Sequence, residues 1–430
     1  MKPEEQVKNY QSDRRMYANY VVRNIKKICK EIGPRIAGSE QEYDAQKRMA
    51  AELETSCDEV KIEDFTVSPW AFMGWVQVAV FCAVVSTLLF FLSELLPKCG
   101  VDIGFLQLPM VAVGAVFVLV ALFFVITEFL FYKETLDPFF KKATSHNVIA
   151  VRKAAGETKR RIILCGHADS APEWRFTYWG GPKLVVPAIG GGILGLLLSV
   201  VFDIIAVVFI CRDKGDSNAL LILSIINACF LPIFLFCLLF YNKKRPVEGA
   251  NDDLTGCYLS MAVPRFLQDK NIRFENTEVM VICTGSEESG LRGAKAFVKA
   301  HADEIKNDGI ETVYFGIDTV RDWDFMAVYN KDMTGTVHNS EKVCKLIKEG
   351  AKLAGFDLPS ATVSLGSTDA AAITQAGLDG ATFAAMDPAP ARYYHTRLDT
   401  ADNLDPKTIE ATVDICLQTV FLFDEKGVNF

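Results

Sequence analysis

Four long apolar segments, almost free of charge, dominate this chain of 430 residues. They cover residues 71–91, 103–127, 184–211 and 219–241, and Asp203 is the one charged residue within them. A helix needs about 20 residues to cross the hydrocarbon core of a bilayer, whereas an apolar run of roughly 10–14 residues is more typical of a buried core helix. Four segments of matching length therefore predict four membrane-spanning helices, paired in two hairpins.

Residues in and around these segments support membrane crossing over burial in a soluble core. Trp and Tyr side chains favour the membrane interface, and near the segment ends the chain places Trp70, Trp75, Tyr132, Trp174, Tyr178, Trp179 and Tyr241. Glycines at helical spacing in the third segment either let a neighbouring helix approach closely or make the helix flexible; they are Gly190, Gly191, Gly192 and Gly195. An acid within a span is a candidate functional residue, but for Asp203 we favour snorkelling or a helix–helix hydrogen bond over ion transport.

Charge and cysteine content exclude other classes of protein. The formal net charge is −8, so the chain lacks the basic excess with which proteins bind phosphate backbones, and we expect no nucleic-acid partner. The twelve cysteines form no CxxC pair and several lie in apolar stretches, which favours a reducing compartment over a disulfide framework. The N-terminal 30 residues carry charges throughout, predicting an amphipathic helix rather than a signal peptide.

The rest of the chain predicts one soluble α/β domain, assembled from residues 1–69, 133–183 and 242–430 and interrupted by transmembrane hairpins at 70–132 and 184–241. Apolar, β-branched runs predict strands at 59–67, 146–151, 160–166, 278–284 and 312–318. Helical patterns occupy 41–54, 254–269, 292–305, 340–355 and 406–424. Strands that alternate with helices predict a mostly parallel mixed sheet flanked by helices.

Polar residues collect where the predicted strands end. His167 and Asp169 follow the strand 160–166, and Glu287 and Glu288 follow 278–284. Asp318 ends the strand 312–318, Asp252 and Asp253 precede a helix, and His395 lies in a loop. Chemistry in such sheets gathers at the carboxyl ends of the strands. Two imidazoles with several carboxylates are the ligand set that zinc prefers, with enough oxygen donors to bridge two ions.

Seven motifs in order carry a family resemblance: GPRIAGSEQEYDAQKRMAAEL, GHADS, GANDDLTG, SEESGLRGAKAF, GID, GSTDAAAI and YHTRLDT. This series resembles the co-catalytic dizinc exopeptidase family, which includes bacterial leucyl aminopeptidase, the glutamate carboxypeptidases and glutaminyl cyclase. The likeness covers essentially all of the chain outside the two hairpins. The chain departs from the family layout in having these two hairpins. The second hairpin begins shortly after the His167 loop in the sequence.

The resemblance implies a site with two zinc ions, and each residue takes its role from the matching motif. Asp252 would bridge both ions, one of which His167 and Asp318 would also bind, while Glu288 and His395 would bind the other. Glu287 would be the general base, taking a proton from a water held between the ions, and its neighbour Glu288 would point to the metal because side chains alternate at a strand end. Asp169 would orient His167.

Several neighbouring residues are interpreted without a metal role. Asp253 is assigned to the N-terminus of the following helix. An oxyanion-stabilising role for Tyr393 or Tyr394 stays open beside a purely structural one. The remaining histidines match no motif residue and are expected to be structural: His146, His301 and His338.

The function that the resemblance implies is a membrane-anchored zinc-dependent exopeptidase, with an aminopeptidase as the first expectation. Its partners would be peptide substrates and the lipid bilayer, and the oligomeric state is left open. The alternatives are an aminoacyl transferase of the glutaminyl cyclase type, a carboxypeptidase, and a catalytically silent receptor or scaffold. The complete ligand set favours the peptidase, and one embedded acid makes a poor transport pathway.

Charge near the span ends predicts the orientation of this multi-pass protein. With four spans, both chain ends and every catalytic segment share one side of the membrane. That side carries eight basic residues, Lys133, Lys141, Lys142, Arg175, Lys183, Lys243, Lys244 and Arg245, and the hairpin tips carry three, Lys98, Arg212 and Lys214. Because basic residues favour the cytoplasmic side, the peptidase domain is predicted to lie in the cytoplasm.

Overall fold

The computed structural model describes residues 2–7 and 9–428, and within them the chain forms two compact units. Unit 1 consists of Met1–Pro69, Lys141–Glu173 and Lys243–Phe430, and unit 2 of Trp70–Phe140 and Trp174–Asn242. Each unit is therefore built from segments that are far apart in the sequence.

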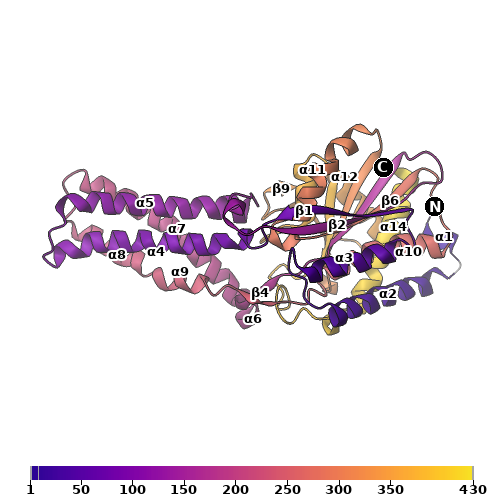
Figure 1. Ribbon diagram of the computed structural model, residues 1–430, viewed down its shortest axis with the longest axis horizontal. Coiled ribbons are helices and arrows are strands. Elements are labelled where there is room, and N and C mark those ends of the chain that lie inside the picture. Colours follow the sequence, from indigo (N-terminus) through magenta and orange to yellow (C-terminus); the bar gives the residue numbers. More distant parts are fainter. Residues whose placement is uncertain (1, 8, 429–430) are drawn as a thin grey trace. The chain divides into compact units, whose positions relative to one another are not determined.

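A nine-stranded mixed sheet forms the centre of unit 1 (Figure 1). The strand order is β1-β2-β6-β3-β7-β11-β8-β10, and β9 pairs with β8. The strands are β1 (Glu59–Val67), β2 (Ala143–Arg152), β3 (Arg160–His167), β6 (Thr277–Thr284), β7 (Glu311–Val320), β8 (Met326–Asp332), β9 (Val337–His338), β10 (Ser360–Thr362) and β11 (Gly380–Ala385). The strands β6, β3, β7 and β11 run parallel, which brings their carboxyl ends to one edge. The predicted α/β fold with a mixed sheet is confirmed.

Helices cover both faces of this sheet because buried side chains alternate along its strands. In β3, Ile162 and Leu164 join one hydrophobic cluster, whereas Ile163 and Cys165 join the other. The first cluster includes residues of α2 (Tyr10–Glu31), α3 (Glu40–Leu53), α10 (Leu254–Asp269), α12 (Glu341–Leu353) and α14 (Pro406–Lys426). The second includes residues of α11 (Arg292–Asn307) and α13 (Asp369–Gln375). A four-residue helix, α1 (Pro3–Gln6), precedes α2.

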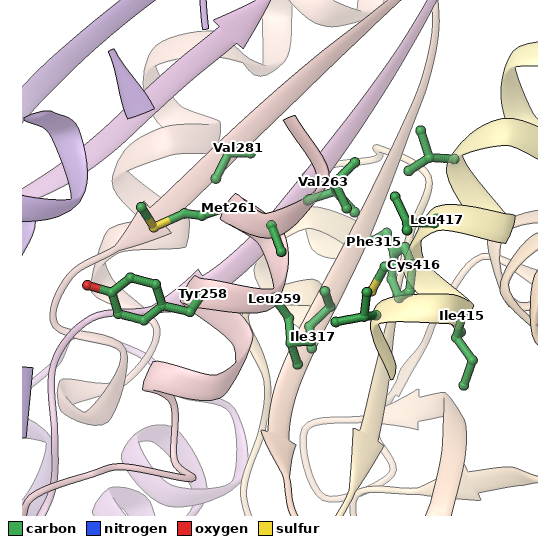
Figure 2. Close-up of a cluster of buried hydrophobic side chains, with 14 of the residues drawn as sticks. Tyr258, Leu259, Met261, Val263, Val281, Phe315, Ile317, Ile415, Cys416 and Leu417 are labelled. Carbon is green, nitrogen blue, oxygen red and sulfur yellow. The ribbon is translucent and has the colours of Figure 1, made fainter. Parts of the chain in front are cut away.

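Figure 2 shows how the larger cluster joins two helices to the sheet. Tyr258, Leu259, Met261 and Val263 come from α10, and Ile415, Cys416 and Leu417 come from α14. Together with Phe315 and Ile317 of β7, these side chains belong to one buried cluster. Burying side chains of this size stabilises a fold by about 1.5–3 kcal/mol each, so α10 is held firmly on the sheet. Its N-terminus carries Asp252 and Asp253.

Unit 2 is helical, and its long helices run alongside one another (Figure 1). It contains α4 (Ala71–Lys98), α5 (Gln107–Phe124) with a wider π-helical turn at Val125–Leu130, α6 (Arg175–Gly180), α7 (Pro182–Ile210), α8 (Asn218–Ala228) and α9 (Leu231–Cys237). Among the described residues, four helical segments are long and apolar enough to cross a membrane. Many of their large apolar side chains are exposed, among them Phe81, Val116, Leu119, Val186 and Ile204. The short strands β4 (Pro172–Trp174) and β5 (Tyr241–Pro246) form a separate two-stranded sheet.

Polar and small residues mark the interior of unit 2. Asp203 is fully buried in α7 and accepts a hydrogen bond from Ser86 of α4 at 3.1 Å. Of the two expected alternatives, snorkelling and a helix–helix hydrogen bond, the structure has the second. A side chain added at Gly195 would come within 2.7 Å of Phe230 and 2.8 Å of Phe234. Glycine at 195 therefore serves close packing between α7 and the start of α9, as the first of the two readings of the glycine run predicted.

The fourth predicted span differs in detail from the expected single helix. Its helix is interrupted between Ala228 and Leu231, and Pro232 lies in the first turn of α9. Proline has no backbone N–H and cannot donate to the carbonyl four residues earlier, so the first helix ends before it. The two pieces together still give an apolar segment from Asn218 to Cys237.

Candidate metal centre

The predicted site residues come together at the carboxyl edge of the parallel strands. His167 is the last residue of β3, and Asp318 lies near the end of its neighbour β7. Strand β6 is the other neighbour of β3, and Glu287 and Glu288 follow it. Asp252 immediately precedes Asp253, the N-cap of α10. His395 arrives on the irregular segment between β11 and α14.

Asp252 lies between the two imidazoles, with one carboxylate oxygen facing each. Its Oδ1 is 3.1 Å from Nε2 of His167, and its Oδ2 is 3.0 Å from Nε2 of His395. On the far side, Nε2 of His395 is 3.1 Å from Oε1 of Glu288. Nε2 of His167 is 3.9 Å from Oε2 of Glu287. This arrangement fits a carboxylate that bridges two metal ions, each of which also has an imidazole ligand.

The donor atoms form two groups whose members lie within 4.8 Å of one another. One group is His167, Asp252 and Glu288, and the other is His167, Asp253 and Asp318. The second group contains Asp253 where the family resemblance places Asp252. Asp253, however, is engaged by backbone donors, accepting from Gly256 N at 2.8 Å, Thr319 N at 3.1 Å and His167 N at 3.0 Å. It caps helix α10, as the sequence predicted, and ties that helix to β3 and β7.

Two glycines let α10 approach the sheet this closely. A Cβ at Gly166 would lie 2.3 Å from the backbone of Gly256 and Cys257, and a Cβ at Gly256 would lie 2.1 Å from the carbonyl oxygen of Ile317. At both positions the nearest atoms belong to the backbone, so a side chain would force α10 and the strands apart. Close backbone contact between the glycines of the GHADS and DDLTG motifs thus positions Asp252, a candidate metal ligand.

Burial, together with an excess of negative over positive charge, displaces the pKa values of the centre. Burial lowers the pKa of His395, but the carboxylates of Glu288 and Asp252 outweigh it and raise the pKa to about 10. Burial, with Asp252 nearby, raises the pKa of Asp318 to about 7. Burial also raises the pKa of Glu287 well above its usual value. A buried group of carboxylates with only two imidazoles fits divalent cations, whose charge would balance it.

Asp169 holds the two glutamates. Its Oδ1 accepts from Glu287 N at 2.9 Å and its Oδ2 from Glu288 N at 3.1 Å, while Oδ1 is 3.4 Å from Nδ1 of His167. The glutamates lie on a short 3-10 turn, Glu287–Ser289, after β6 has ended at Thr284. The expectation that strand alternation separates their side chains is therefore wrong, because this turn and Asp169 set their directions.

Three supporting residues were missed from the sequence. Asp399 accepts from Asn251 N at 2.8 Å and from Asp252 N at 3.2 Å. Arg35 is fully buried and donates to the carbonyl oxygens of residues 33, 168, 248 and 249. Glu42 accepts from Ser286 N at 2.7 Å, and burial and the charge of Asp169 raise its pKa to about 8. All three lie inside the family motifs, and membership of a motif was the one sequence feature that could have indicated them.

The remaining tyrosine and histidine candidates have contacts of their own. Tyr393 is buried and donates to Asp322 Oδ2 at 3.0 Å, whereas the ring of Tyr394 stacks on His395 with centroids 3.9 Å apart. His146 stacks on Tyr43 and His301 lies 2.7 Å from Glu63. His338 is exposed on β9.

Comparison with known families supports the relationship. The model of peptidase family M28 matches residues 239–420, a stretch that includes Asp252, Glu288, Asp318 and His395, while His167 precedes it. Aminopeptidase YwaD of Bacillus subtilis (strain 168) is 27% identical over 200 residues, which are 44% of this chain and 41% of that relative. The sequence match thus spans less than half of the relative's length.

Solved structures share the fold over nearly the whole chain. The zinc aminopeptidase BSAP from Bacillus subtilis has a TM-score of 0.54 at 17% identity and covers 94% of both chains. An aminopeptidase from Aneurinibacillus sp. strain AM-1 has a TM-score of 0.53 at 16% identity, covering 94% of this chain and 93% of that one. A glutaminyl cyclase from Fimbriiglobus ruber has a TM-score of 0.54 at 13% identity, covering 94% and 95%.

The zinc exopeptidase fold expected from the motifs is thereby confirmed, and zinc is the cofactor that the family implies. Over residues 239–420 the chain is similar to peptidase family M28, and its structure has the fold of the zinc aminopeptidases named above.

Proposed function

We propose that this protein is a membrane-anchored zinc-dependent exopeptidase, and specifically an aminopeptidase that removes N-terminal residues from peptides. The observation that carries the proposal is the placement of Asp252 between two buried imidazoles, 3.1 Å and 3.0 Å away, with Glu287 and Glu288 beside them. The match to peptidase family M28 supports the same reaction class.

The metal ligands in this proposal follow the family pattern. His167 and Asp318 would hold one zinc ion and Glu288 and His395 the other, with Asp252 bridging both. Bound there, the two ions would supply Lewis-acid polarisation of the scissile carbonyl and a more acidic water. Burial of the donors supports their role, since a carboxylate out of water binds a cation more strongly.

Glu287 is the general base in this mechanism. Its carboxylate accepts a proton from the attacking water and returns that proton to the leaving amine. Two features accompany the assignment: the Glu287 backbone N–H donates to Asp169 at 2.9 Å, and burial raises the pKa of Glu287 well above its usual value. Asp169 also lies against Nδ1 of His167, so it orients both the base and a ligand.

Metal content and turnover of point variants test the assignment. We expect about two zinc ions per chain in the wild-type protein and fewer in His395→Ala or Asp252→Ala. Glu287→Gln should keep nearly all of its zinc and lose at least ~10²-fold in turnover, the usual contribution of a general base. The matched control is Glu288→Gln, which should lose zinc. If Glu287→Gln lost zinc and kept turnover, the roles of the two glutamates would be reversed.

Substrate panels separate the aminopeptidase from its alternatives. Aminoacyl anilides and dipeptides with a free amine should be cleaved, and their N-acetylated forms should not. Release of residues from the C-terminus would instead indicate a carboxypeptidase. The fold shared with glutaminyl cyclase makes cyclisation of N-terminal glutamine the second candidate, which ammonia release without peptide cleavage would reveal. Zinc without either activity would point to a receptor or scaffold.

We also propose that unit 2 crosses the bilayer as four spans and that unit 1 lies in the cytoplasm. The lengths and apolar character of the four helices support the spans. The excess of eight basic residues over three supports the orientation. Peptide substrates would then come from the cytoplasm.

A further inference from the structure

A two-pronged ion pair joins the His395 segment to the segment that follows His167. Nε of Arg397 donates to Oε1 of Glu173 at 2.5 Å, and Nη2 donates to Oε2 at 2.8 Å. Glu173 is fully buried, whereas the side chain of Arg397 is 39% exposed. Such two-pronged pairs between a guanidinium and a carboxylate fix orientation as well as distance.

The position of each partner in the sequence connects the pair to the metal centre. Arg397 is two residues beyond His395, and Glu173 is four residues beyond Asp169. Glu173 is also the last residue of unit 1 before the chain continues into unit 2 at Trp174. The pair thus fixes, within unit 1, the His395 segment to the end of the segment that follows His167.

His395 depends on such ties because its own backbone is irregular. Its φ is +53°, a conformation that residues with a Cβ rarely adopt, and no helix or strand holds residues 391–400. Within the segment, Thr396 donates to the carbonyl of Arg392 at 2.8 Å. Toward the rest of unit 1, Asp399 bonds to Asn251, and Arg397 bonds to Glu173.

We propose that Glu173 and Arg397 form a positioning pair for His395. The pair fixes the buried imidazole of His395 where it can bind the second zinc ion. The inference rests on the proposed metal centre and adds to it two residues outside the family motifs' ligand set. Partners that orient a metal ligand typically contribute 10–100-fold to metal affinity. Neither residue touches the reacting atoms in this assignment, so their loss acts through His395.

Zinc affinity of Arg397→Ala tests the pair. In a chelator competition, the variant should bind one zinc as the wild-type protein does and the second about 10–100-fold more weakly. Because Arg397 is partly exposed, added guanidinium should recover part of the second affinity, whereas sodium chloride at the same ionic strength should not. Arg397→Lys, which keeps the charge and loses the fork, should be intermediate.

The matched control is Arg273→Ala. Arg273 makes the same two-pronged contact with Asp58, at 2.8 Å and 3.0 Å, and its side chain is 37% exposed, but it lies outside the site. This variant should bind both zinc ions normally and show no response to guanidinium. Unchanged zinc affinity in both Arg397→Ala and Arg397→Lys, or an equal loss in Arg273→Ala, would overturn the proposal.

The readout separates this inference from the proposed function. A wild-type protein that binds two zinc ions and cleaves no peptide would contradict the proposed function, while the affinity loss in Arg397→Ala would still support the positioning pair. A wild-type protein that binds no zinc would overturn both.

Discussion

Asp169 shows how one carboxylate can fix the backbone of two consecutive glutamates. Its two oxygens accept from the consecutive N–H groups of Glu287 and Glu288, and the same side chain lies 3.4 Å from the ring of His167. The backbone of the glutamate turn is thereby fixed from outside. Loss of one acceptor would leave a buried N–H without its partner, which costs about 1–3 kcal/mol.

Asp169→Asn is therefore expected to lower turnover about 10–100-fold, because an amide offers one acceptor oxygen where the carboxylate offers two. Steady-state kinetics and zinc content of the purified variant measure this. The control is Asp64→Asn, which alters a similar contact, 3.5 Å from His146, on an exposed side chain. Equal activity of the two variants would contradict the role given to Asp169.

Residue types at strand ends made the ligand candidates predictable, but their supports were not. His167, Asp318 and the glutamates follow recognisable strands, so their shared edge could be anticipated. Arg35 donates to the carbonyl oxygens of Ala168 and Glu248, which are 133 and 213 residues away in the sequence. Its role depends on loop geometry that spacing in the sequence does not encode. Asp399 supports Asp252 in the same long-range way.

At the scale of elements, α7 and α9 pack through glycine. At Gly195 a Cβ would meet the rings of Phe230 and Phe234, whereas at Gly190 it would meet no atom within 4 Å among the described residues. The two positions lie on the same helix and differ in what they face. They therefore offer a direct test of helix packing in unit 2.

Gly195→Val should destabilise unit 2 by about 1–3 kcal/mol, the usual cost of inserting volume into a packed interior. Gly190→Val should change stability little. The two variants are compared by heating them in detergent and measuring the fraction of protein that remains monodisperse at each temperature. A larger loss in Gly190→Val than in Gly195→Val would mean that the contact between α7 and α9 is not formed in the protein.

Long elements were predictable from the sequence and short ones were not. Helix α10 has the predicted bounds, and the strands of the centre of the sheet lie within a few residues of theirs. Four strands of the large sheet were not predicted: β8, β9, β10 and β11. The strands β9 and β10 have two and three residues, and the sequences MAVYNKD of β8 and GATFAA of β11 carry too few β-branched residues to stand out.

At the scale of the whole molecule, native cysteines report on the proposed orientation. Cys99 and Cys211 are exposed and lie at the ends of α4 and α7, at the two hairpin tips. In intact cells both should react with a membrane-impermeant thiol reagent, because the tips are proposed to face outward. Cys99→Ser with Cys211→Ser should abolish this labelling.

The complementary site is Ala300, an exposed position on α11. With both tip cysteines replaced, Ala300→Cys should react only after lysis. Labelling of Ala300→Cys in intact cells, with protection of the two tips, would place unit 1 outside and contradict the cytoplasmic assignment.

The strand order has a consequence for synthesis. Strand β6 pairs with both β2 and β3, which are consecutive in the sequence and do not pair with each other. Until the ribosome has passed residue 284, these two strands have no common partner and His167 has no glutamates to face. Both hairpins have left the ribosome by then. The candidate metal centre can therefore form only after all four apolar helices have been synthesised.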